Sequence, residues 1–93
     1  MSAAVQVRLP PVLRPVMGGR VSLDGEGTTI DSVLRNLARA HPALGLHLFD
    51  EAGTARRNIV CLHAGAAVRA NEFAGRAVCD GDELVLTNAL AGG

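Results

Sequence analysis

Side chains capable of nucleophilic or metal chemistry are few in this sequence. Cysteine occurs only as Cys61 and Cys79, and histidine only at positions 41, 47 and 63. Two thiols cannot supply a four-thiolate zinc or iron–sulfur site, and no histidine pair combines metal-ligand spacing with a nearby carboxylate. A Cys61–His63 dyad on one strand face is conceivable, but core packing of Cys61 is favoured because no third group is evident to orient the imidazole. Cys79, beside a turn, could be an accessible thiol.

A glycine pair raises the question of cofactor binding. Gly25-Glu26-Gly27 follows a predicted strand and precedes a predicted helix, as in a dinucleotide-binding fingerprint. Ile30 stands where the third glycine of that fingerprint should be, and no second strand–helix unit follows. We therefore interpret these residues as a turn between a hairpin and a helix. The sequence also contains no P-loop, so we expect this chain to bind neither a cofactor nor ATP on its own.

The C-terminus, Leu90-Ala91-Gly92-Gly93, is the segment most informative about function. Glycine has no side chain to pack and loses much conformational entropy on ordering, so two terminal glycines add little to a fold. A tail of small residues can instead thread a narrow channel and present the Gly93 carboxylate to the active site of another protein. Gly92 and Ala91 would serve that threading.

Composition excludes several classes of protein. The 93 residues are enough for one domain. Nine arginines balance nine acidic residues, and only two residues are aromatic, so neither the basic surface nor the stacking platforms of nucleic-acid binders are expected. No apolar stretch approaches the roughly 18 residues that span a bilayer, and the N-terminus does not resemble a signal peptide. We expect a cytoplasmic protein without nucleic-acid or membrane partners.

Hydrophobic periodicity and turn residues predict the elements. Alternation indicates strands over 4–9, 20–24, 58–64 and 83–88, with a short strand over 66–71; Val21 and Leu23 would point inward. One amphipathic helix is expected from Ile30 towards position 41, with Thr28 as its N-cap, Asp31 reaching back to that cap and Pro42 ending the helix. The apolar segment 43–49 would be a short helical turn or irregular, and 72–78 irregular.

These elements place the C-terminal tail directly after a strand. Their order predicts an α+β fold with one main helix over a mixed sheet of four or five strands. Asp80-Gly81-Asp82 is typical of a tight turn, after which Leu84 and Leu86 would point inward and Val85 outward. A first and a last strand that lie side by side and parallel would make this a β-grasp fold. We expect a domain over 1–88 and a flexible tail over 89–93.

On these residues the chain resembles the ubiquitin-like sulfur carriers of the ThiS/MoaD family. The specific part is Asp80-Gly81-Asp82-Glu83-Leu84-Val85-Leu86 leading to Ala91-Gly92-Gly93, and the pattern of elements covers nearly all of the chain. Leu13-Arg14-Pro15 with Gly18-Gly19 is similar to the CysO-type carriers of cysteine biosynthesis. The resemblance implies a β-grasp, ubiquitin-like fold.

The resemblance also implies a mechanism that depends on partners. An E1-like enzyme resembling MoeB or ThiF would use ATP to adenylate Gly93. A sulfide donor or a sulfurtransferase would then displace AMP and leave a thiocarboxylate, which a sulfur-accepting biosynthetic enzyme would consume. The chain itself would be a carrier and not an enzyme, a monomer when free, with no metal and no cofactor.

The docking residues and the sulfur acceptor complete these expectations. Leu90 and Val85 are apolar residues near the functional terminus and are candidate docking anchors. The chain could instead be a molybdopterin synthase small subunit, a carrier for another metabolite, a ubiquitin-like modifier of lysines or a plain β-grasp interaction module. The sequence does not name the acceptor.

Overall fold

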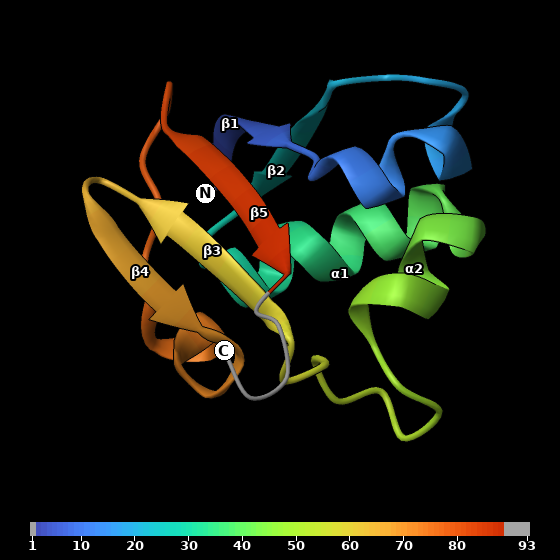
Figure 1. Ribbon diagram of the computed structural model, residues 1–93. Helices are drawn as coiled ribbons and strands as arrows, with labels where there is room; N and C mark the ends of the chain where they lie inside the picture. Colours follow the sequence, from blue (N-terminus) through green and yellow to red (C-terminus); the bar gives the residue numbers. More distant parts are fainter. Residues whose placement is uncertain (1, 89–93) are drawn as a thin grey trace.

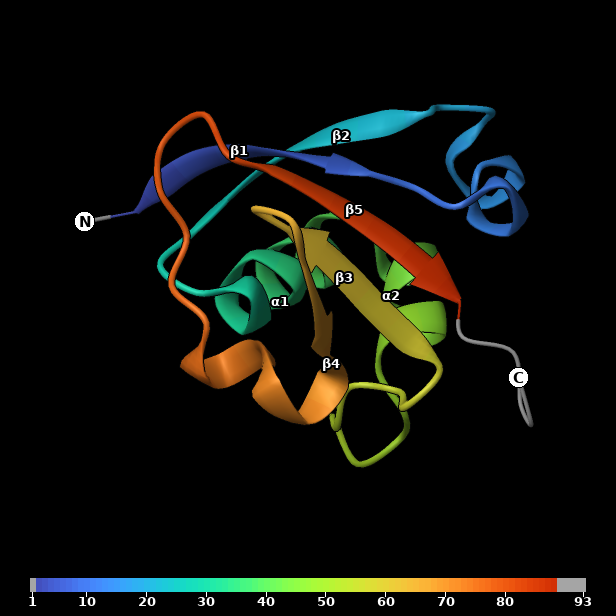
Figure 2. The same ribbon diagram turned by 60° about the vertical axis from the view of Figure 1, so that its left-hand side comes forward.

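A mixed five-stranded sheet, with helices packed on one face, is the framework of the computed structural model, which describes residues 2–88 (Figures 1 and 2). The strand order is β2-β1-β5-β3-β4. The strands and α-helices are β1 (Ala3–Arg8), β2 (Ser22–Gly27), α1 (Ile30–Ala40), α2 (Pro42–Leu48), β3 (Ile59–His63), β4 (Ala66–Arg69) and β5 (Glu83–Asn88). Three 3-10 helices are η1 (Pro11–Leu13), η2 (Pro15–Met17) and η3 (Ala70–Gly75).

Strand β5 lies at the centre of the sheet. It runs parallel to β1, with Arg8 opposite Val85, and antiparallel to β3, with Leu62 opposite Val85. Strands β1 and β2 form an antiparallel hairpin, and β3 and β4 form another. The first and last strands are therefore neighbours and parallel, which confirms the predicted β-grasp arrangement.

The predicted turn at Gly25-Glu26-Gly27 is wrong, because β2 continues through Gly27, which pairs with Ala3. The glycines serve close packing of the helix instead. A Cβ added at Gly27 would lie 2.7 Å from the backbone nitrogen of Val33 in α1. The strand persists there because a residue without a side chain lets α1 cross it closely.

The start of α1 differs from the prediction by one residue. Thr29, not Thr28, is the N-cap: its Oγ1 accepts from the Ser32 N–H at 3.1 Å, and Ser32 Oγ accepts from the Thr29 N–H at 2.9 Å. This reciprocal pair is a capping box, so Ser32 takes the role expected of Asp31. Pro42 ends α1 as predicted, and it then begins α2, where a missing N–H costs little.

Two connections are more regular than expected. The segment after β1 forms η1 and η2 and then turns at Gly18 and Gly19, whose φ angles are +67° and +88°. The segment expected to be irregular begins within η3, where Phe73 is buried. Val21, predicted to point inward, is 43% exposed, because β2 begins only at Ser22.

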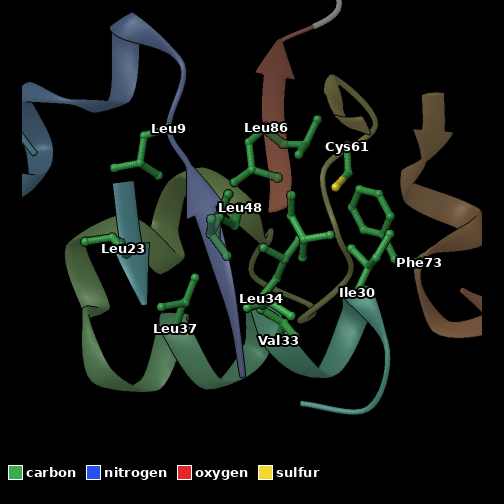
Figure 3. Close-up of a cluster of buried hydrophobic side chains, with 14 of the residues drawn as sticks. Leu9, Leu23, Ile30, Val33, Leu34, Leu37, Leu48, Cys61, Phe73 and Leu86 are labelled. Carbon is green, nitrogen blue, oxygen red and sulfur yellow. The ribbon is translucent and has the colours of Figure 1, made fainter. Parts of the chain in front are cut away.

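The core lies between the sheet and the helices. Figure 3 shows side chains of α1, β5 and η3 converging there, with Cys61 among them. The apolar stripe of α1 is wholly buried, as its spacing predicted: Ile30, Val33, Leu34 and Leu37. No helix in the described part of the chain has the length and apolar character needed to cross a membrane.

Candidate functional site

The tail expected over residues 89–93 directly follows β5, the central strand of the sheet. Leu84 and Leu86 of β5 are 0% and 1% exposed, and Asn88 pairs with Ile59 of β3. The buried leucines and the pairing with β3 therefore hold β5 in the sheet up to the residue before the tail. Residues 89–93 lie outside the described part of the chain, so the roles expected of Leu90, Ala91, Gly92 and Gly93 stay predictions.

The outer face of the sheet carries an apolar patch next to this root. Val85 points away from the core, as its position between two buried leucines predicted. Directly opposite it on β3 is Leu62, which is 42% exposed, and Ala67 of β4 is in turn opposite Leu62. With Val60, two residues before Leu62 on the same face, these residues form what we call the sheet patch: Val60, Leu62, Ala67 and Val85.

Sequence reasoning found only one member of the sheet patch. It assigned docking to Val85 and gave no role to Val60, Leu62 or Ala67. The missing information was the register, since Leu62 and Val85 are 23 positions apart and meet only because β3 and β5 pair. Arg8 lies on the other side of Val85, so the patch has a basic edge.

The turn that begins β5 is held by hydrogen bonds to two other strands. At β1, the Ala4 N–H donates to Asp80 Oδ1 at 2.7 Å, and the Gly81 N–H donates to the Ala4 carbonyl at 2.8 Å. Gly81 has a φ of +86°, which favours glycine and confirms the predicted tight turn. Asp82 faces β3, where its Oδ2 lies 2.7 Å from Nε2 of the buried His63.

His63 is the central residue of a polar network that the sequence did not reveal. Arg76 Nε donates to His63 Nδ1 at 3.0 Å, so Nδ1 is the acceptor and Nε2 carries the proton that is donated to Asp82. The hydrogen bond from His63 and then the one from the Cys79 N–H hold the pKa of Asp82 below its usual value. The network joins β3, the segment after η3 and the start of β5. Its role is therefore to position the start of β5 against β3.

The thiols lie in contrasting environments. Cys61 is fully buried, and burial raises the pKa of its thiol to about 12, so it is protonated at neutral pH. A Cys61–His63 nucleophilic dyad is therefore wrong, and the favoured core packing is confirmed. Cys79 is an exposed free thiol. Among residues 2–88, no group of three His, Cys, Asp or Glu side chains could hold a metal ion.

Within the described residues, this arrangement contains no metal-binding cluster, and its buried thiol is protonated. It presents an apolar patch with a basic edge beside a strand that continues into a glycine-terminated tail. The strand order and the parallel pairing of β1 with β5 thus define the class of fold, that of a small β-grasp protein.

Comparison with known proteins agrees with that class. A model of the ThiS family matches residues 7–93. The sulfur carrier protein CysO of Mycobacterium tuberculosis is 29% identical over 96 residues, covering 96% of this chain and 98% of CysO. The chain belongs to the ThiS family and is a sulfur carrier protein similar to CysO, not an enzyme.

Solved structures support the same fold. A chain of the Amycolatopsis orientalis BexX/CysO complex superposes with a TM-score of 0.78 and 30% identity, covering 97% of this chain and all of that one. The small archaeal modifier protein SAMP1 of Haloferax volcanii superposes with a TM-score of 0.75 and 33% identity, covering 98% of this chain and all of SAMP1. The ubiquitin-like, β-grasp assignment is thereby confirmed.

Proposed function

We propose that this protein carries sulfur on the carboxylate of Gly93. In the first step the carboxylate attacks ATP in the active site of an E1-like, MoeB- or ThiF-like enzyme, giving an acyl adenylate and pyrophosphate. Sulfide then attacks the acyl carbon, AMP leaves and a thiocarboxylate remains at Gly93. No oxidant or reductant is needed, and no side chain of the carrier takes part.

The observation that carries this proposal is the position of the tail. Five residues ending in Gly92-Gly93 follow a central strand whose inward side chains, Leu84 and Leu86, are buried, and the family match extends to residue 93. The anchored strand would deliver the terminus while the small residues Ala91 and Gly92 enter a channel too narrow for larger side chains. That delivery makes the next step effectively intramolecular.

Docking would use the sheet patch and the tail together. Leu62 and Val85 offer an apolar surface next to the root of the tail, and Leu90 adds one apolar side chain within it. Apolar anchors that become buried dominate the energetics of many interfaces. We therefore assign partner docking to Val85, Leu62 and Leu90.

The similarity to CysO favours cysteine, or another sulfur-containing metabolite, as the product of the acceptor enzyme. The BexX/CysO complex is a precedent for a carrier of this fold bound to a further protein, and a sulfur-accepting biosynthetic enzyme is the partner we propose here. A molybdopterin synthase small subunit would use the same chemistry with a different acceptor. We place the carrier in the cytoplasm, as a monomer when free.

Mass spectrometry of the intact protein tests the carrier function. Incubation with an E1-like enzyme, ATP and sulfide should add about 16 Da, the exchange of one oxygen for sulfur at a single carboxyl group. A variant that lacks Gly93 is the matched control and should not gain mass. A gain that persists in that variant would place the sulfur elsewhere.

The similarity to SAMP1 favours a second candidate function, that of a protein modifier. A modifier would form covalent conjugates with lysines of larger proteins, whereas a carrier would be recovered unmodified or as its thiocarboxylate. Blotting a cell extract for the tagged protein separates the two. A ladder of high-mass species that survives boiling with thiol and vanishes when Gly93 is deleted would support the modifier.

A further inference from the structure

A mostly apolar groove of about 440 Å³ opens beside the last residues of β5. One wall is the end of β5 from Val85 to Asn88, and the other is the segment that leaves β1, including Pro10 and Val12. Val12 is 63% exposed although it is apolar. Figure 2 shows β5 and the segment after β1 diverging at this end of the sheet. Arg8 and Arg14 complete the lining, which contains no carboxylate among the described residues.

The groove exists because the ladder between β1 and β5 stops early. Its last pair is Arg8 with Val85. The Gln6 N–H donates to the Asp82 carbonyl, so by alternation the carbonyl of Leu86 and the N–H of Asn88 also point to the β1 side. The next residue of β1 that could pair with them is Pro10, which has no N–H, and the chain then turns into η1.

Two features of the groove indicate an extended peptide as its occupant. Backbone groups at a strand end whose neighbour has turned away are a template for another strand, and strand addition is a common mode of peptide recognition. The apolar wall with two arginines suits a segment that carries an apolar side chain next to an acidic one. Arg14 is held for this role by its Nε, which donates to the Leu9 carbonyl at 3.1 Å.

We propose that the groove receives an extended, acidic-apolar segment of the activating enzyme, which pairs with β5 at residues 86–88. This inference rests on the proposed function. The added strand would thus pair with the residues that directly precede the tail, and so would hold the carrier by the strand from which the tail starts. Val12 would cover the apolar side chain of that segment, and Arg8 and Arg14 would face its carboxylate.

Two pairs of variants test the proposal, with the purified E1-like enzyme that supports the mass exchange as the probe. Val12→Glu places a negative charge in the groove, and Leu46→Glu is its control, since Leu46 is 72% exposed on α2 and does not line the groove. Asn88→Pro removes the N–H that would pair, and Asn88→Ala keeps it. We expect Val12→Glu and Asn88→Pro to raise Kd roughly tenfold or more, Leu46→Glu to stay within about twofold of the wild type, and Asn88→Ala to bind at least about fivefold more tightly than Asn88→Pro.

Three results would overturn the proposal. Wild-type affinity of folded Val12→Glu would refute the groove, and because Val12 is exposed that variant tests it even if Asn88→Pro does not fold. Faster activation of Val12→Glu would indicate that the carrier's own tail fills the groove. A concentration-dependent dimer that Val12→Glu abolishes would indicate a second copy. Failure of the carrier function is distinct, since the wild type would then gain no sulfur at all.

Discussion

Replacing Gly27 with alanine should destabilise the fold strongly although the change adds one methyl group. The new Cβ would lie 2.5 Å from Ser32 Oγ and 2.7 Å from the Val33 backbone nitrogen. Neither atom can yield cheaply, because Ser32 Oγ completes the capping box of α1 and the nitrogen belongs to the helix backbone. The glycine is needed here for the close approach of α1 to β2.

The size of the effect follows from three contributions. Overpacking a tight site costs about 1–3 kcal/mol, and loss of the cap costs about 0.5–2 kcal/mol. The reduced entropy of the unfolded chain returns about 0.4–1 kcal/mol. We therefore expect Gly27→Ala to lower the free energy of unfolding by about 2–3 kcal/mol, which for a chain of this size lowers Tm by roughly 10–20 °C.

Urea and thermal unfolding followed by circular dichroism measure this change. Gly75→Ala is the matched control: its added Cβ meets nothing within 4 Å, so stability should stay the same or rise by up to about 1 kcal/mol. Because β2 is the edge strand and β5 is central, folded Gly27→Ala should still gain sulfur at the wild-type rate. Stability of Gly27→Ala within about 0.5 kcal/mol of the wild type would refute the close-approach argument.

Three further predictions concern the tail, the thiols and the network below β5. Gly92→Val should keep the Tm and slow adenylation, since a β-branched residue restricts both the backbone and passage through a channel; unchanged kinetics of pyrophosphate release would contradict threading. Cys61→Ala with Cys79→Ser should still gain and donate sulfur while losing roughly 1 kcal/mol of stability; loss of transfer by the folded variant would point to a persulfide relay. Asp82→Asn should make the free energy of unfolding fall less steeply as the pH is lowered into the acid range. The pKa of Asp82 is lower in the folded protein than its ordinary value of 3.8. Its contribution to the free energy of unfolding is therefore present above that ordinary pKa and is lost as the pH falls through the lower folded pKa. Acid-unfolding curves of the wild type and Asp82→Asn that superimpose would refute this role.

Local sequence determined the elements that a short stretch of chain can specify. The 3.6-residue spacing from Ile30 to Leu37 is a property of the helix itself, and α1 buries those residues. Alternation over Glu83–Asn88, preceded by Gly81, predicted β5 residue for residue, and the same rule placed Val85 on the outer face. The glycine-terminated tail is likewise a feature of the sequence alone.

Contacts between residues far apart in the chain were decided only by the tertiary structure. The sequence pattern predicted a turn at Gly27, and only the packing of α1 against it shows why glycine is needed there. His63 likewise bonds to Arg76 and Asp82, which follow it in the chain by 13 and 19 positions. The sheet patch depends on the register between β3 and β5. The groove depends on where β1 turns away from β5. Pro10 ends β1 in any fold, but backbone groups of residues 86–88 lack a partner from β1 only because β5 continues beyond its last pair with β1.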